Sequence, residues 1–159
     1  MHRIEAGFEK INFSKKSLLD ILENAEAIKL YNGLQNGRTR SVVLMAIGLD
    51  SGGNEQGDQY TQAHTSGTIT KLSRAVKDIQ VSNANRDRKI TAFSTIFGKE
   101  DLMALLNSSG VDGIDFMPTK KANSSGSQVL TLTAAPSGSS QEIMQMNALM
   151  SPCPPDCFQ

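Results

Sequence analysis

The side chains with the greatest intrinsic reactivity in this chain are two cysteines near its C-terminal end. Cys153 and Cys157 are separated by Pro-Pro-Asp, a spacing at which two thiols can close a disulfide or supply half of a soft-metal site. A zinc site needs four ligands, and the sequence offers only His2 and His64 to complete one. We therefore treat Cys153 and Cys157 as a candidate redox pair and expect no metal and no cofactor. A short tail, disulfide-linked or reduced, or an element that attaches to a partner is the favoured interpretation.

Other sequence patterns that carry catalysis are missing. There is no G-x-S-x-G elbow, and with two histidines in the chain a Ser-His-Asp site has few ways to form. No G-x-G-x-x-G occurs, and the loop GLQNGRT lacks the Walker spacing. We therefore assign no catalytic, cofactor-binding or metal-ligating residue, and an enzyme is the less favoured interpretation.

Basic residues in two polar turns are the best candidates for binding nucleic acid. They are Arg38, Arg40, Arg86, Arg88 and Lys89. Nucleic-acid sites interleave such charges with exposed aromatic side chains, whereas this chain has no Trp and two Tyr, and Asp87 interrupts the second cluster. A solvated turn is the favoured interpretation, and binding through the Arg86–Lys89 turn is a weaker alternative.

An apolar stripe rich in methionine follows Ser139. Ser139 and Glu142 have the spacing of a capping box, which predicts a short helix that ends before Pro152. The candidate partner contacts on this helix are Ile143, Met146, Leu149 and Met150. Methionine adapts to irregular surfaces, so the stripe is expected to dock either on another subunit or on the chain's own sheet.

Composition and charge favour one globular domain. The chain has 159 residues, 38% of them hydrophobic, and its 16 basic and 16 acidic side chains cancel. A zero net charge gives no global attraction to phosphate backbones or anionic lipids. The N-terminus has no apolar segment of the kind found in a secretory signal, and no stretch approaches the length of a membrane span. We therefore expect a cytoplasmic protein without membrane contact.

Two stretches of the chain share one pattern. FSKKSLLDIL (13–22) and FGKEDLMALL (97–106) each place Phe before a helix cap position and Leu four residues beyond that cap, which is the spacing of a hydrophobic staple. Each predicted helix is followed by a strand, a Gly-containing polar loop and a second strand. The sequence therefore predicts an internal repeat of a helix-plus-hairpin unit, over about 13–52 and 97–138.

The remaining segments complete the predicted architecture. Residues 51–67 are polar and rich in glycine, which predicts a long surface loop, and residues 68–80 place Ile69, Leu72, Val76 and Ile79 on one helical face. Residues 81–89 are expected to form a charged turn, and 90–97 a strand; Phe8 and Ile11 suggest a short edge strand before the first helix. These elements predict an α+β fold, with an antiparallel sheet of about four to six strands and the helices on one face. We expect a single domain over 1–138, followed by a short helix and a Pro/Cys tail over 139–159.

The sequence supports three functional interpretations. The leading one is a non-enzymatic interaction or assembly protein that binds a protein partner or a second copy of itself. The alternative is a small-molecule-binding or enzymatic domain with a pocket between the two repeat halves, near the loops at 33–41, 50–67 and 119–127. Nucleic-acid binding through the arginine turn is the weakest of the three.

Overall fold

The computed structural model describes residues 5–35, 41–87, 89–122, 124–138 and Pro152. Within these residues the chain forms three helices and eight strands, and the strand pairings are antiparallel, which confirms the α+β class. In chain order the elements are β1 (Ile11–Ser14), α1 (Lys15–Leu22), β2 (Ala27–Leu34), β3 (Val42–Leu49), β4 (Gln59–His64), β5 (Ile69–Ser73), α2 (Arg74–Arg86), β6 (Ser94–Gly98), α3 (Lys99–Leu106), β7 (Val111–Ala122) and β8 (Gln128–Gly138).

The strands form two sheets, not the single sheet that the sequence predicted. One sheet has the order β1-β7-β8 and the other the order β5-β4-β3-β2-β6. The prediction was wrong because β1 and β6 each pair with a strand distant in the sequence, β7 and β2 respectively. β1 approaches β7 so closely that a Cβ atom at Gly113 would lie 2.6 Å from the carbonyl oxygen of Phe13.

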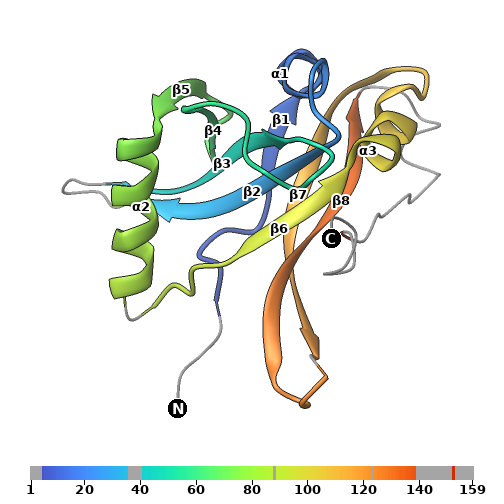
Figure 1. Ribbon diagram of the computed structural model, residues 1–159. Coiled ribbons are helices and arrows are strands. Elements are labelled where there is room, and N and C mark those ends of the chain that lie inside the picture. Colours follow the sequence, from blue (N-terminus) through green and yellow to red (C-terminus); the bar gives the residue numbers. More distant parts are fainter. Residues whose placement is uncertain (1–4, 36–40, 88, 123, 139–151, 153–159) are drawn as a thin grey trace.

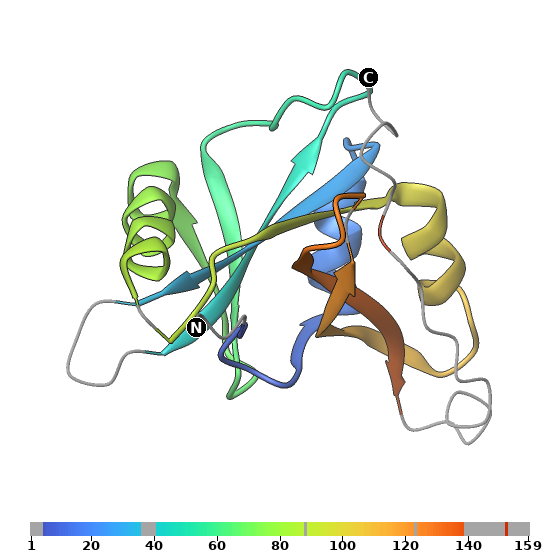
Figure 2. The same cartoon turned by 90° about the horizontal axis from the view of Figure 1, so that it is seen from below.

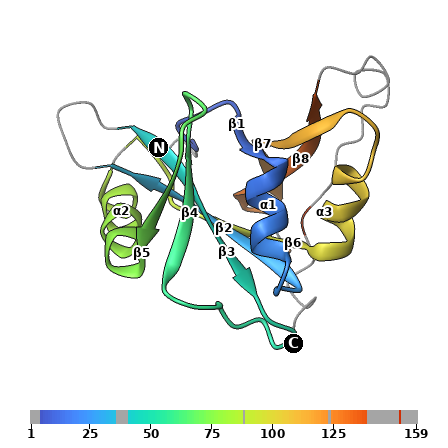
Figure 3. The ribbon, with the colours of Figure 1, turned by 90° about the horizontal axis from the view of Figure 1, so that it is seen from above.

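The helices lie on both faces of the five-stranded sheet, so the predicted one-sided arrangement is also wrong. On one face α2 packs against β2, where a Cβ atom at Gly33 would lie 3.1 Å from the Cβ of Gln80. On the other face α1 approaches Gly48, whose Cβ would lie 3.4 Å from Ile21 Cγ2. Gly33 and Ile28 are both on β2 and are five residues apart, so they face opposite sides of the sheet. Gly48 lies opposite Ile28 and shares its face. Figure 3 shows α1 and α2 on opposite sides of β2 and β3.

The largest apolar core of the described residues includes side chains of both sheets and of α1 and α3. Figure 2 shows how these sheets and helices are arranged. Phe116 occupies its centre, with ring centroids 5.7 Å from Phe13 and 5.4 Å from Phe97. All three rings are fully buried. These aromatic contacts join β1, β6 and β7, so the core links the two sheets to each other.

The pairing of β1 with β7 and that of β6 with β2 follow the same scheme. Phe13 on β1 lies opposite Ile114 on β7, and Phe97 on β6 lies opposite Ile28 on β2. Both halves also run in the order strand, helix, strand, strand. The first strand of each half therefore pairs with the second strand of the other half.

The first helix begins where the sequence predicted. Ser14 adopts an extended backbone, and its hydroxyl accepts a hydrogen bond from the Ser17 amide at 3.2 Å, which is the geometry of an N-cap. α3 begins in the same way after Gly98, which has no side chain with which to form that bond. The short strand β1 lies at the edge of its sheet, as expected.

The segment between the halves differs most from the prediction. The expected loop at 51–67 contains the strand β4, and the expected helix at 68–80 begins as the strand β5, because the two strands pair with each other. α2 starts only at Arg74 and runs through the expected turn to Arg86. The predicted inner face was therefore wrong: Val76 and Ile79 are 40% and 47% exposed, and the buried side chains of α2 are those of Lys77, Gln80 and Ala84.

A long hairpin extends away from the body of the molecule (Figure 1). β1 pairs with β7 only as far as Phe116, so beyond this point β7 and β8 form a two-stranded ribbon within the described residues. We call residues 117–122 and 128–133 the β7–β8 arm. Side chains near its tip, at 119–122 and 128–129, are exposed.

Candidate functional site

A connected group of polar side chains joins α2, β2, β4 and the connection from β3 to β4. Glu55 sits in the connection from β3 to β4, and its backbone bridges to Leu49. The Tyr31 hydroxyl donates to Glu55 Oε2 at 2.8 Å, and the Tyr60 hydroxyl donates to Glu55 Oε1. Because Tyr31 is on β2 and Tyr60 on β4, one carboxylate fastens a loop to two separate strands.

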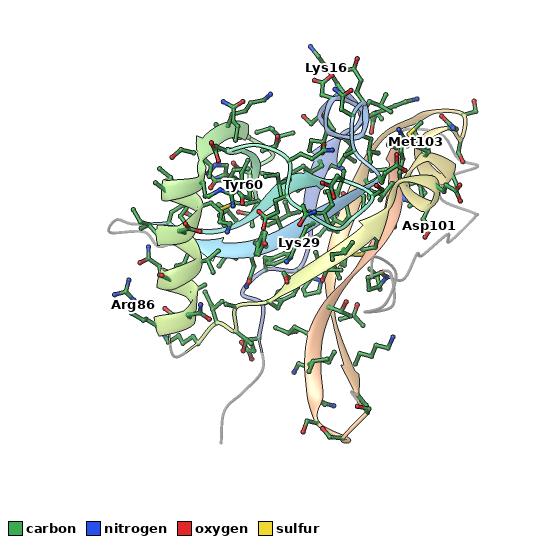
Figure 4. The ribbon with its side chains drawn as sticks, viewed as in Figure 1. Lys16, Lys29, Tyr60, Arg86, Asp101 and Met103 are labelled. Carbon is green, nitrogen blue, oxygen red and sulfur yellow. The ribbon has the colours of Figure 1, made fainter. Side chains whose placement is uncertain are left out.

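Two cations from α2 complete this group. Arg74 Nη1 lies 3.4 Å from Glu55 Oε1, and its guanidinium lies 5.4 Å from the centre of the Tyr60 ring. Lys77 Nζ lies 4.5 Å and 5.1 Å from the ring centres of Tyr31 and Tyr60, with its side chain only 10% exposed. Figure 4 shows Tyr60 beside α2. We call Tyr31, Glu55, Tyr60, Arg74 and Lys77 the tyrosine–glutamate cluster.

Burial and hydrogen bonding in the tyrosine–glutamate cluster shift the pKa values of its tyrosines and its glutamate further from neutral pH. Burial, followed by the hydrogen bond to Glu55, raises the pKa of both Tyr31 and Tyr60. Burial alone would raise the pKa of Glu55, but the hydrogen bonds from the two tyrosines and the nearby Lys77 and Arg74 outweigh it, so the net pKa is lowered. General acids and bases work best with a pKa near the working pH. The cluster is therefore arranged as a clamp and not as an acid–base pair.

Replacing Glu55 with glutamine is expected to reduce stability by about 1–2 kcal/mol at pH 7, because two hydroxyls lose a charged acceptor. The folded-state pKa of Glu55 is below the unfolded one, so its contribution is present above pH ~4.3 and disappears as pH falls through the lower folded value. For Tyr31 and Tyr60 the folded-state pKa is raised, so their contribution is complete below pH ~10 and is lost at higher pH.

Urea unfolding of the wild type and Glu55→Gln between pH 7 and pH 3 measures this effect. The wild type should lose more stability on acidification than the variant does. Glu23→Gln is the control, because the Glu23 side chain is exposed. Equal losses in the wild type and Glu55→Gln would contradict the proposed clamp.

A polar groove lies on the other face of the sheet, between α1 and the strands β3 to β5. Its volume is about 390 Å³, within the range of small-ligand sites. Its polar lining comprises Ser17, Asp20, Asn24, Gln56, Gln59, Thr61, Thr70 and Lys71. Most of these side chains are exposed, including the only charged ones, Asp20 and Lys71. The groove is therefore shallow.

A second cavity, of about 460 Å³, lies between residues 5–9 and the arm residues Pro118, Lys120 and Leu130. Neither cavity is lined by residues of both 13–52 and 97–138, the two halves between which the sequence placed a pocket. The pocket expected between the halves thus gains no support from these two cavities.

Most candidate site residues from the sequence lie outside the described residues. These are Arg38, Arg40, Arg88, Ile143, Met146, Leu149, Met150, Cys153 and Cys157. Arg86 is the last residue of α2, at the opposite end of the helix from Tyr60, and its Nε donates to the Ser82 carbonyl at 3.4 Å. The backbone amide of Lys89 donates to Asp87 Oδ1 at 2.7 Å. The expected basic patch stays a prediction.

Sequence reasoning missed the tyrosine–glutamate cluster altogether. The sequence placed Glu55 and Tyr60 in a polar surface loop, and its choice of Val76 and Ile79 for the inner face of a helix left Lys77 off that face. The available signal was Tyr60 itself, because a buried tyrosine usually finds a hydrogen-bond partner for its hydroxyl. A neighbouring acid such as Glu55 is the natural acceptor.

Broader searches add no chemistry to the described part of the chain. No three His, Cys, Asp or Glu side chains there are grouped so that they could hold a metal ion. Nor is any helix within it long and apolar enough to cross a membrane. Compared with known proteins, the chain matches no family model, no curated protein and no solved structure.

Proposed function

We propose that the protein is a non-enzymatic interaction protein that binds an extended protein strand along the outer edge of β8. The observation that carries this proposal is that the outer edge of β8 has no pairing partner among the described residues. β8 pairs with β7 on one side, and no described residue pairs with it on the other. An unpaired edge presents a row of amide and carbonyl groups, which is the usual template for adding a strand from another chain.

The composition of β8 supports strand addition. Natural edge strands are commonly protected from pairing by lysine, by inward-pointing charges or by proline. β8 contains no charged residue, and its single proline, Pro136, lies near the base of the arm. Its middle, from Val129 to Ala135, is rich in β-branched residues and so favours extended structure.

The geometry of the β7–β8 arm supports the same interpretation. An isolated two-stranded ribbon is marginally stable in water, and further strands or a packed helix are needed to stabilise it. The tip of the arm is exposed on both strands, and Val129 there is 41% exposed. The base of the arm is held by the core, in which Leu132 is fully buried, so a bound strand would stabilise mainly the exposed tip.

We also propose that the fold contains two copies of one strand–helix–hairpin unit, β1-α1-β2-β3 and β6-α3-β7-β8. Support comes from the reciprocal register and from buried side chains that recur at matching places in the two halves. The matching pairs are Phe13 and Phe97, Leu18 and Leu102, Leu22 and Leu106, Ile28 and Ile114, Leu30 and Phe116, Leu44 and Leu132, and Ala46 and Ala134. In this correspondence β8 is the counterpart of β3.

The correspondence supports the choice of β8 as the binding edge. β3 is covered on its outer edge by β4, which pairs antiparallel with Val43–Ala46. The counterparts of these residues on β8 are Thr131–Ala134, whose outer edge has no described partner. Among the described residues, the second half thus has no counterpart of β4.

The shifted pKa values of the tyrosine–glutamate cluster suit it to holding the connection from β3 to β4 and not to proton transfer. A second candidate function is binding of a small polar ligand in the groove beside α1, which offers amide and hydroxyl groups from α1, β4 and β5. This candidate ranks lower because most of the lining side chains are exposed, and a ligand there would stay largely hydrated.

Placing lysines on the arm tests the proposed function. Val129→Lys/Thr131→Lys is expected to weaken association, with itself or with a captured protein, by about tenfold or more, because an edge charge must be desolvated on strand addition. The readouts are sedimentation mass over a concentration series and affinity capture from extract of the source cell.

The matched control is Val76→Lys/Ile79→Lys, which adds the same charge at exposed positions of α2, away from the arm. It should associate as the wild type does. The proposed function fails if the arm variant keeps every association of the wild type, or if the wild type shows none.

A further inference from the structure

We infer that the strand added to β8 is β8 of a second copy of this chain, so that two arms join into one continuous antiparallel sheet with the order β1-β7-β8-β8-β7-β1. This inference rests on the proposed function, since it names the occupant of the same edge. It also specifies a register, which gives it a test of its own.

Symmetry and full overlap of the two strands together determine that register. Two identical antiparallel neighbours are related by a two-fold axis perpendicular to the sheet, so one residue must lie opposite its own equivalent. β8 runs from Gln128 to Gly138, and its midpoint is Thr133. Full overlap therefore places Thr133 opposite Thr133 of the second copy, and Thr131 opposite Ala135 of the second copy. This centre falls within Thr131–Ala134, the counterpart of the stretch of β3 that pairs with β4.

The contact between the two β8 strands involves no charged side chains. No side chain of β8 is charged, so two copies of the strand meet without like-charge repulsion. Thr131 and Thr133, near the centre, are only partly exposed, and they are small enough to face Ala135 and Thr133 of the second copy respectively. Cross-strand pairs of threonine are among those that stabilise antiparallel sheets.

Charges on β7 favour the antiparallel orientation. Lys120 and Lys121 lie near the tip of the arm, and Asp112 and Asp115 lie near its base. Antiparallel pairing brings the basic tip of each copy beside the acidic base of the other, whereas parallel pairing would align tip with tip. The two β7 strands would be three strand spacings apart, about 14 Å. This exceeds the Debye length of about 8 Å in physiological salt, so the charges select orientation and add little affinity.

Single cysteines on β8 test the register in the full-length chain, with Cys153→Ser/Cys157→Ser as background. Under mild oxidation Thr133→Cys should form a disulfide-linked dimer about tenfold faster than Thr131→Cys or Ala135→Cys alone. In the inferred register the last two positions lie about 14 Å from their own equivalents, too far for a disulfide. An equimolar mixture of Thr131→Cys and Ala135→Cys should instead give the mixed dimer.

Circular dichroism and urea unfolding of each cysteine variant establish that it is folded. Sedimentation of the Cys153→Ser/Cys157→Ser background protein at about 100 µM measures dimer formation without any disulfide. The inference is overturned if the background protein stays monomeric at this concentration, or if the three single-cysteine variants crosslink equally. A monomeric wild type that still captures another protein, and loses it through Val129→Lys/Thr131→Lys, would overturn the second copy as occupant and leave the proposed function standing. Absence of both associations would overturn both.

Discussion

Phe116→Ala is expected to lower the free energy of unfolding by about 3–5 kcal/mol, the usual cost of removing a buried aromatic ring. Phe116 is fully buried, and its ring contacts Phe13 at 5.7 Å and Phe97 at 5.4 Å between ring centres. Because these neighbours come from β1 and β6, the cavity would open where the two sheets meet. Domains of this size are stable by about 5–15 kcal/mol in total, so the loss would be a large fraction.

Urea unfolding followed by circular dichroism measures the loss. Phe116→Leu should cost less than Phe116→Ala, because leucine refills part of the cavity. Val129→Ala, on the exposed tip of the arm, is the control and should change stability by less than about 0.5 kcal/mol. A loss below about 1 kcal/mol for Phe116→Ala would show that the sheets are not joined through this ring.

Asn32→Ala is expected to cost about 2–4 kcal/mol, because it removes two hydrogen bonds in a buried place. The Asn32 side chain is 1% exposed, its Nδ2 donates to the Thr91 carbonyl at 2.8 Å, and its Oδ1 accepts from the Phe93 amide at 2.8 Å. These bonds hold the chain just before β6, where ladder pairing with β2 has not yet begun. Without them the partly buried Phe93 amide and Thr91 carbonyl lose their side-chain partner.

Asn32→Asp keeps the hydrogen bond from the Phe93 amide and removes the one to the Thr91 carbonyl. The aspartate still accepts from Phe93 but has no donor for the Thr91 carbonyl, and it places a charge in a buried position. It should therefore also be destabilising, and its loss should grow as pH rises through the carboxyl pKa. Thr119→Ala on the exposed arm is a suitable control. If Asn32→Ala unfolds at the same urea concentration as the wild type, the proposed anchoring of β6 is wrong.

Local signals in the sequence determined the elements whose structure depends on near neighbours. The Ser14 cap and the apolar spacing of Leu18 and Leu22 were sufficient for α1, because a cap and a helical face are formed within about two turns. A continuous apolar run likewise located β3, and apolar residues alternating with threonine located β8. The α+β class followed from the mixture of these signals.

The same signals failed where the partner was distant. Residues 68–73 have a plausible helical periodicity, but pairing with β4 makes them β5, and the start of α2 therefore moves to Arg74. The shifted helix turns Lys77 inward, where the rings of Tyr31 and Tyr60 receive its ammonium group. A hydrophobicity pattern cannot predict this burial, because it scores lysine as a surface residue whatever lies opposite it.

The arrangement of the strands was likewise decided only by the tertiary structure. Pattern and propensity identify a strand, but its partner depends on which distant chain segment can close a loop onto it and bury apolar surface with it. Thus β1 pairs with β7 and β6 with β2, which divides the strands between two sheets. The same division leaves β8 at an edge, and the outer edge of β8 is where we expect the protein to bind its partner.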